Sequence, residues 1–104
     1  MDKREAIVEK ARAYKDLVSK SFPVAFEKCY LFGSYAKGTP HEHSDIDIAL
    51  VVDHLNERYS ILDTEPLLWK IARRIDIRIS PVVIARDTDY AGFLSEIQRT
   101  GVEV

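Results

Sequence analysis

The sequence has little of several features that mark whole classes of protein. It holds one cysteine in 104 residues, which excludes an internal disulfide, and the apolar neighbours of Cys29 favour a buried strand position over a nucleophile. Long apolar runs are missing too: residues 46–52 contain an aspartate and fall far short of the ~20 residues that a membrane span needs. Residues 1–5 are charged and lack an apolar signal core, which predicts a cytoplasmic protein.

The sequence also lacks an excess of either charge. Fifteen Lys and Arg residues face seventeen Asp and Glu residues, so the net charge is −2 and no global positive field exists to attract nucleic acid or anionic membrane. With 46% hydrophobic and 31% charged residues, the composition is that of a globular protein and excludes wholesale disorder. The length predicts a single domain, residues 1–104, with a core of its own.

Hydrophobic periodicity predicts an α+β fold. The predicted helices are residues 3–20, residues 64–73 with Thr64 as cap and Pro66 in the first turn, and a last helix between Asp89 and Gly101. The predicted strands are residues 24–32, 45–52 and 74–79, the last from strict alternation of Ile75, Ile77 and Ile79 with polar residues. A bend of this third strand at Pro81, before the apolar residues 82–84, stays open. We expect a small mixed β-sheet that carries acids at the edge of one face and is backed by helices on the other. Tyr14 and Trp69 fit helical stripes and are expected in the core.

A composite motif carries most of the functional information. Gly33 and Ser34 are followed, after ten intervening residues, by Asp45 and Asp47. Because side chains alternate along a strand, both carboxylates face the same side. Like charges held this close repel, and a divalent cation with oxygen ligands is the usual partner that relieves the repulsion.

Two further features extend this motif. Asp76 supplies a third carboxylate if its strand lies beside the first, and three acids can hold two metal ions ~3.5–4 Å apart for an in-line phosphoryl or nucleotidyl displacement. Gly33 allows close approach of a polyphosphate, and Ser34 offers a hydroxyl and an N–H group at a helix start. Asp63 competes for the role of third acid, although its place near a predicted helix start favours capping.

The residues of this motif resemble a known family. The match rests on two segments, Gly33-Ser34-Tyr35-Ala36-Lys37-Gly38 and Ser44-Asp45-Ile46-Asp47-Ile48. They look like the signature of the polymerase-beta-like nucleotidyltransferase superfamily, in the small single-domain form called minimal nucleotidyltransferases. The resemblance implies the nucleotidyltransferase fold, with Asp45 and Asp47 binding the metals that carry the triphosphate and Asp76 completing the catalytic metal site. Lys37 stands where arginine is common, which keeps the charge but loses bidentate geometry.

The resemblance also implies a reaction and a partner. We expect transfer of AMP from ATP to a hydroxyl acceptor with two Mg²⁺ ions. Small members of the family pair with a helical protein of the HEPN type, so we expect a toxin-antitoxin role, with a homodimer as the alternative assembly. Two other functions stay open: a partner-binding module without catalysis, and a two-chain transferase that acts on a small molecule such as an antibiotic.

Other polar and aromatic residues near the motif are weaker candidates. Lys37 and Arg78 are candidates for phosphate binding, and Arg78 shares the predicted strand face of Asp76. Tyr35 could stack on a base. Three histidines could form a transition-metal site, but an exposed loop is the favoured interpretation: His41, His43 and His54.

Overall fold

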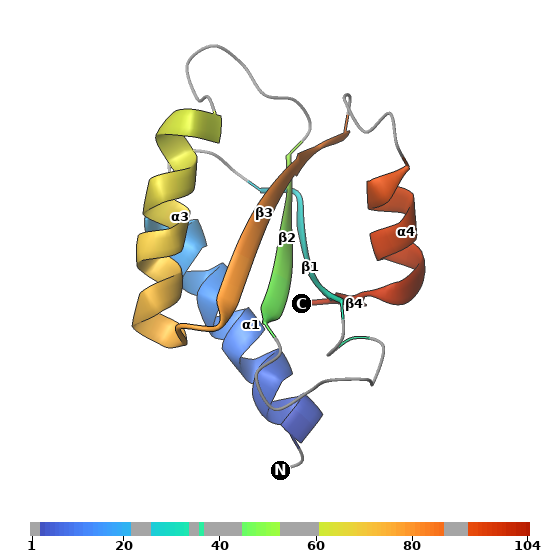
Figure 1. Ribbon diagram of the computed structural model, residues 1–104, viewed down its shortest axis with the longest axis horizontal. Helices are drawn as coiled ribbons and strands as arrows, with labels where there is room; N and C mark the ends of the chain where they lie inside the picture. Colours follow the sequence, from blue (N-terminus) through green and yellow to red (C-terminus); the bar gives the residue numbers. More distant parts are fainter. Residues whose placement is uncertain (1–2, 22–25, 34–35, 37–44, 53–60, 87–91) are drawn as a thin grey trace.

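The computed structural model describes residues 3–21, 26–33, 36, 45–52, 61–86 and 92–104, without the side chains of 61–64. Its elements are α1 (Lys3–Ser21), β1 (Lys28–Phe32), β2 (Ile46–Val52), α3 (Ile61–Ile75), β3 (Ile79–Ala85), α4 (Phe93–Thr100) and β4 (Val102–Glu103). These helices surround one sheet (Figure 1). The predicted α+β class is confirmed.

The four strands form a mixed sheet in the order β3-β2-β1-β4. β1 pairs antiparallel with β2 and β4, whereas β2 and β3 are parallel. In this register Phe32 lies opposite Asp47, and Ile46 lies opposite Ile79. The end of β1, the start of β2 and the start of β3 therefore meet at one end of the sheet, which is where the sequence motif lies.

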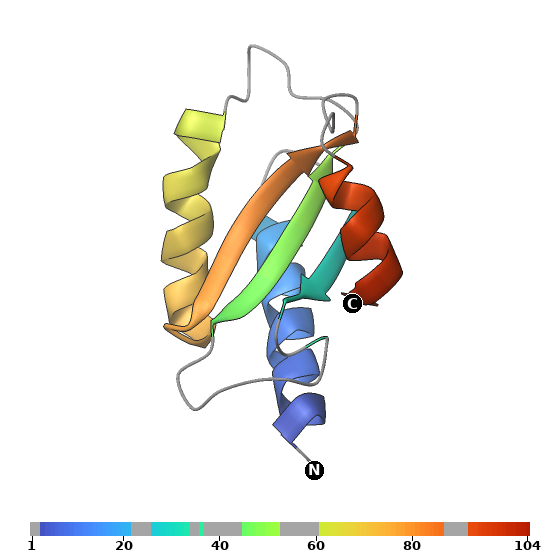
Figure 2. The ribbon, with the colours of Figure 1, turned by 45° about the vertical axis from the view of Figure 1, so that its right-hand side comes forward.

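Helices cover both faces of the sheet (Figures 1 and 2). α1 and α3 pack on the face formed by side chains such as Leu31, Ile48 and Ile79. α4 packs through Leu94 and Ile97 on the opposite face. The expectation of helices on a single face was therefore wrong, because the apolar stripe of the short α4 covers a second apolar side of the sheet.

The core on the α1 and α3 face agrees with the sequence patterns. The helical stripe of α1 is buried, and Tyr14 in it is fully buried and donates a hydrogen bond from its hydroxyl to the carbonyl of Leu68 at 3.0 Å. Cys29 in β1 is also buried, which confirms its core position. No helix in the described part of the chain is long and apolar enough to span a membrane.

The segment 61–79 differs from its prediction. α3 begins at Ile61 rather than after a Thr64 cap, and Pro66 lies inside the helix. A third strand is present, but its predicted start at residue 74 was wrong, because the helix continues to Ile75 and β3 runs from Ile79 through Pro81 to Ala85. The stripe on α3 that faces the core explains this outcome, since it buries Leu68, Ile71 and Ala72 and packs Ile75 against them. Ile77, in the turn between α3 and β3, is 84% exposed.

Trp69 is a further correction. It was expected in the core, but it lies outside the buried stripe of α3 and its exposed fraction is 38%.

The remaining boundaries shift less. β1 begins at Lys28, later than predicted. Gly101 ends α4 as predicted, and its N–H donates to the carbonyl of Ile97 at 2.6 Å, while Asp89 lies outside the described residues. The two-residue strand β4 was not predicted, since nothing in so short a segment signals pairing with β1.

Candidate active site

Gly33, directly after β1, lies against Asp47 of β2. Its φ of +77° falls in the left-handed region, where a side chain is strained. A Cβ added at this position would collide with Oδ2 of Asp47 and lie 3.2 Å from its Cγ. A glycine is therefore required here for two reasons, backbone conformation and the approach of the carboxylate. The predicted pairing of the glycine loop with the acids is present in the fold.

Asp45, directly before β2, and Asp47 in β2 lie close enough to interact. Burial raises the pKa of Asp47, and the negative charge of Asp45 raises it further. Asp47 shares its face of the sheet with Ala49 and Val51, so apolar side chains surround it on the strand side. A divalent cation that takes the oxygens of both carboxylates as ligands relieves the repulsion between them. Asp45 and Asp47 therefore fit one such ion.

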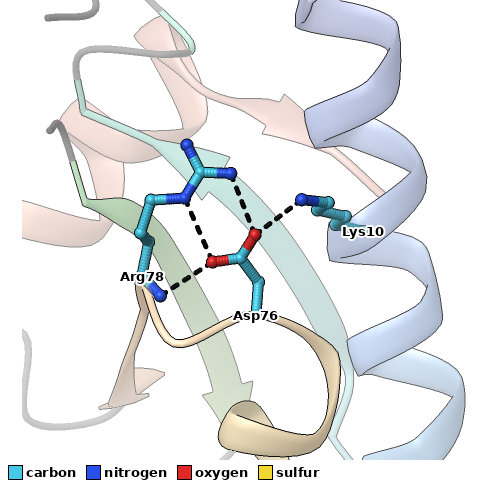
Figure 3. A network of polar contacts seen from close by, with 3 residues as sticks. All are labelled: Lys10, Asp76 and Arg78. Carbon is cyan, nitrogen blue, oxygen red and sulfur yellow. Dashed lines mark hydrogen bonds and ion pairs between the residues drawn. The ribbon is translucent and has the colours of Figure 1, made fainter. Parts of the chain in front are cut away.

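Asp76 lies at the end of α3 in a different environment (Figure 3). Oδ2 of Asp76 accepts hydrogen bonds from Lys10 Nζ at 2.6 Å and Arg78 Nη2 at 2.9 Å. Oδ1 accepts from Arg78 Nε at 3.1 Å and from the backbone N–H of Arg78 at 2.8 Å. The side-chain bonds from Arg78, supported by Lys10, hold the pKa of the Asp76 carboxyl well below its usual range. Its side chain is only 10% exposed.

The structure brings Asp76 to the same end of the sheet as the acid pair, but not into one cluster with it. The carbonyl of Arg78 accepts a hydrogen bond from the N–H of Ile46 at 2.8 Å, so the two groups adjoin at the β2–β3 junction. Among the described residues, no three acidic, histidine or cysteine side chains form a group that could hold a metal ion. The β3 residue opposite Asp47 is Ser80. Asp76 therefore belongs to no group of acidic side chains among the described residues that could hold a second metal ion.

Several predicted site residues lie outside the described part of the chain. These are Ser34, Lys37, Tyr35, His41, His43 and His54. The rival acid Asp63 lies within α3, and its side chain is likewise not described.

Sequence reasoning missed two groups at this end of the molecule. Lys10 lies outside the buried stripe of α1, and no local pattern could have linked it to an acid 66 residues away. Phe32, opposite Asp47 in the sheet, makes an edge-on contact with Phe93 of α4, with ring centroids 5.7 Å apart. Phe93 is 43% exposed, so an aromatic surface adjoins the acid-bearing face.

Comparison with known proteins agrees with this geometry. The sequence model of the family described as polymerase beta, nucleotidyltransferase, matches residues 15–104. The chain belongs to this family. It is therefore a nucleotidyltransferase, as the motif at Gly33 and Asp45–Asp47 predicts.

Three relatives of this nucleotidyltransferase are informative. A protein of Methanocaldococcus jannaschii, provisionally named a protein adenylyltransferase, is 31% identical over 101 residues, which cover 94% of this chain and 98% of that one. A crystal structure provisionally described as a nucleotidyltransferase from Sulfolobus solfataricus has a TM-score of 0.62 and 26% identity, over 97% of this chain and 79% of that one. A toxin-antitoxin structure with AMP-PNP has a TM-score of 0.65 and 26% identity, over 89% of this chain and 70% of the other.

Proposed function

We propose that this nucleotidyltransferase transfers AMP from ATP, with Mg²⁺, to a hydroxyl group of a partner protein of the HEPN type, and that it acts as the antitoxin of that partner. One observation carries the proposal: Gly33 lies against Asp47, with the charge of Asp45 close by. This places a backbone able to approach phosphates beside carboxylates able to hold the cation that accompanies them.

Each candidate site residue has a distinct role in this proposal. Asp45 and Asp47 hold the Mg²⁺ that carries the triphosphate, and Gly33 leaves room for the phosphates. Mg²⁺ supplies positive charge to the phosphate oxygens during displacement. Asp76 acts on the acceptor side, where its carboxylate is held ionised beside Arg78. Ser34 and Lys37 are proposed to bind phosphates.

The relatives support the choice of nucleotide and partner. The archaeal relative carries the provisional name of a protein adenylyltransferase, and the toxin-antitoxin structure contains an ATP analogue. Both agree with ATP as donor and a protein as acceptor.

The experiment measures incorporation of label from α-labelled ATP into the partner that copurifies from the native host. Asp45→Asn and Asp47→Asn should weaken nucleotide binding and abolish transfer together, because each removes a charged oxygen ligand. Asp76→Asn should leave nucleotide binding largely intact and reduce transfer by orders of magnitude. Asp63→Asn serves as the control for the rival acid and should transfer normally.

Three results would contradict the proposal. A wild-type protein that binds no Mg-nucleoside triphosphate, alone or with its partner, excludes the site itself. Binding without transfer, combined with neutralisation of the toxin by all Asp variants, indicates a partner-binding module without catalysis. Transfer by the monomer to a small hydroxylated molecule excludes the protein acceptor.

A further inference from the structure

The carboxylate of Asp76 has no lone pair left for a metal ion. A carboxylate offers about four acceptor positions, two on each oxygen. Four donors fill them here: Lys10 Nζ and Arg78 Nη2 on Oδ2, and Arg78 Nε and the Arg78 backbone N–H on Oδ1. Figure 3 shows the two side chains converging on Asp76 from opposite sides. A metal ion could bind this acid only after displacing a donor.

The two cations of this cluster differ in how firmly they are held. Arg78 makes three of the four bonds and follows Asp76 closely in the sequence, so its position is set locally. Lys10 makes one bond, comes from α1, and is 39% exposed. Its ammonium group is a compact point charge on a flexible stem. Lys10 is therefore the donor whose position at Oδ2 a metal ion would compete for.

The origin of Lys10 is also informative. The family match covers residues 15–104, so Lys10 lies in the part of α1 that precedes the matched domain. The same part of α1 places a guanidinium nitrogen of Arg4 3.5 Å from the carbonyl of Ala36, just beyond Gly33. This half of α1 thus contacts both the glycine loop and the third acid, and it brings positive charge to each.

We propose that the ammonium group of Lys10 takes the place of a second metal ion at Asp76, so that the protein loads one divalent ion, on Asp45 and Asp47, with its nucleotide. The inference rests on the proposed function and modifies it at two points: the number of ions, and the role of Asp76, which acts on the acceptor side by holding Arg78 rather than through its own oxygens. Lys10 is in this view a positioning residue. It keeps Asp76 saturated, and Asp76 in turn fixes the guanidinium of Arg78, whose backbone carbonyl pairs with the start of β2.

The test counts protein-bound Mn²⁺ by equilibrium dialysis, in which free Mn²⁺ and free Mn-nucleotide reach the same concentration on both sides of the membrane. The probe is α,β-methylene ATP at a concentration equal to that of the protein, because its α–β linkage resists nucleotidyl transfer. Wild-type protein should bind one Mn²⁺ per nucleotide. Lys10→Met should bind two, since removal of the ammonium frees a lone pair on Oδ2 of Asp76 and leaves a carboxylate paired only with Arg78.

Three variants control this experiment. Lys10→Gln is a second neutral replacement in case the methionine variant folds poorly, and it should also bind two ions. Lys10→Arg keeps the positive charge and should restore a count of one. Lys15→Met removes a lysine from the same helix that bonds the carbonyl of Val104 at 2.8 Å, and it should stay at one ion.

The outcomes separate this inference from the proposed function. Two ions on the wild-type protein overturn the inference and leave the nucleotidyl transfer proposal intact. One ion on the wild-type protein and on both neutral Lys10 variants also overturns it, because Lys10 would then not exclude the second ion. No Mn²⁺-nucleotide bound by the wild-type protein overturns the proposed function and this inference together.

Discussion

The carboxylate of Asp47 lies where a side chain at Gly33 would have to go, since a methyl group on the glycine would collide with it. The register explains this contact, because Phe32 lies opposite Asp47 and the chain turns at the next residue. The backbone conformation at Gly33 and the position of the Asp47 carboxylate are therefore coupled.

Gly33→Ala tests this coupling. The left-handed backbone should cost about 1–2 kcal/mol of unfolding free energy, and the displaced Asp47 carboxylate should weaken Mg-ATP binding. Urea denaturation and calorimetric titration measure the two effects. Gly92→Ala is the matched control, because Gly92 has a φ of +70° but open space around it. It should lose similar stability and keep its nucleotide affinity; equal losses of affinity in the two variants would refute the coupling.

Asp47→Asn should stabilise the protein without ligand. The pKa of Asp47 is raised in the folded state, so its ionised form costs stability at pH 7 and this cost disappears as the pH falls below about 4. Because the side chain is partly exposed, we expect a gain of up to about 1 kcal/mol at pH 7. Urea unfolding at pH 7 and pH 3 measures the difference, which should vanish at the lower pH. A loss of stability at pH 7 would contradict this account.

Asp76→Asn should have the opposite effect. The pKa of Asp76 is lowered in the folded state, so its stabilisation is fully present above about pH 4 and is lost as the pH falls through the folded value. We expect a loss of about 2 kcal/mol at pH 7, because several charged hydrogen bonds break in a nearly buried site. The gap between wild type and variant should narrow below pH 4 in urea unfolding. A gap that is independent of pH would show that charge is not its cause.

Tyr14→Phe removes a buried hydrogen bond between α1 and α3. The hydroxyl donates to Leu68 at 3.0 Å, and its loss leaves a carbonyl without this donor, at a cost of about 1 kcal/mol. Tyr30→Phe is the comparison, since its hydroxyl accepts only a long bond of 3.5 Å from Gln98. Thermal unfolding should rank the first variant clearly below the second. Equal melting temperatures would count against a role of this bond in joining the helices.

The parts of the fold that follow from local pattern could be predicted from the sequence. The apolar residues of α1 fit only a helical repeat, and the β-branched run of β2 fits only a strand. Both elements are present where they were predicted. Gly33 and the acid pair were predicted to lie together from their types and spacing, and Gly33 does lie against Asp47; the phosphate and cation binding inferred from them stays a prediction. The predictions of α1 and β2 are confirmed because each of their residue patterns is compatible with only one type of secondary structure.

The region around Asp76 has two competing patterns. Ile75 fits a strand that alternates with Ile77 and Ile79, and it also fits the helical stripe of α3. Packing against the core selected the helix, and this choice moved Asp76 off the strand into the turn where Lys10 reaches it. A contact across 66 residues depends on how α1 crosses the sheet, which no local spacing encodes.

The buried thiol of Cys29 can report how often β1 separates from its neighbouring strands. It is the single cysteine of the chain, its side chain is 1% exposed, and burial raises its pKa to about 12. A thiol-specific reagent can therefore react only during moments when β1 separates from its neighbours. Because β1 leads directly into Gly33, the rate of this reaction reports how often the loop loses its support, and a bound nucleotide should slow it.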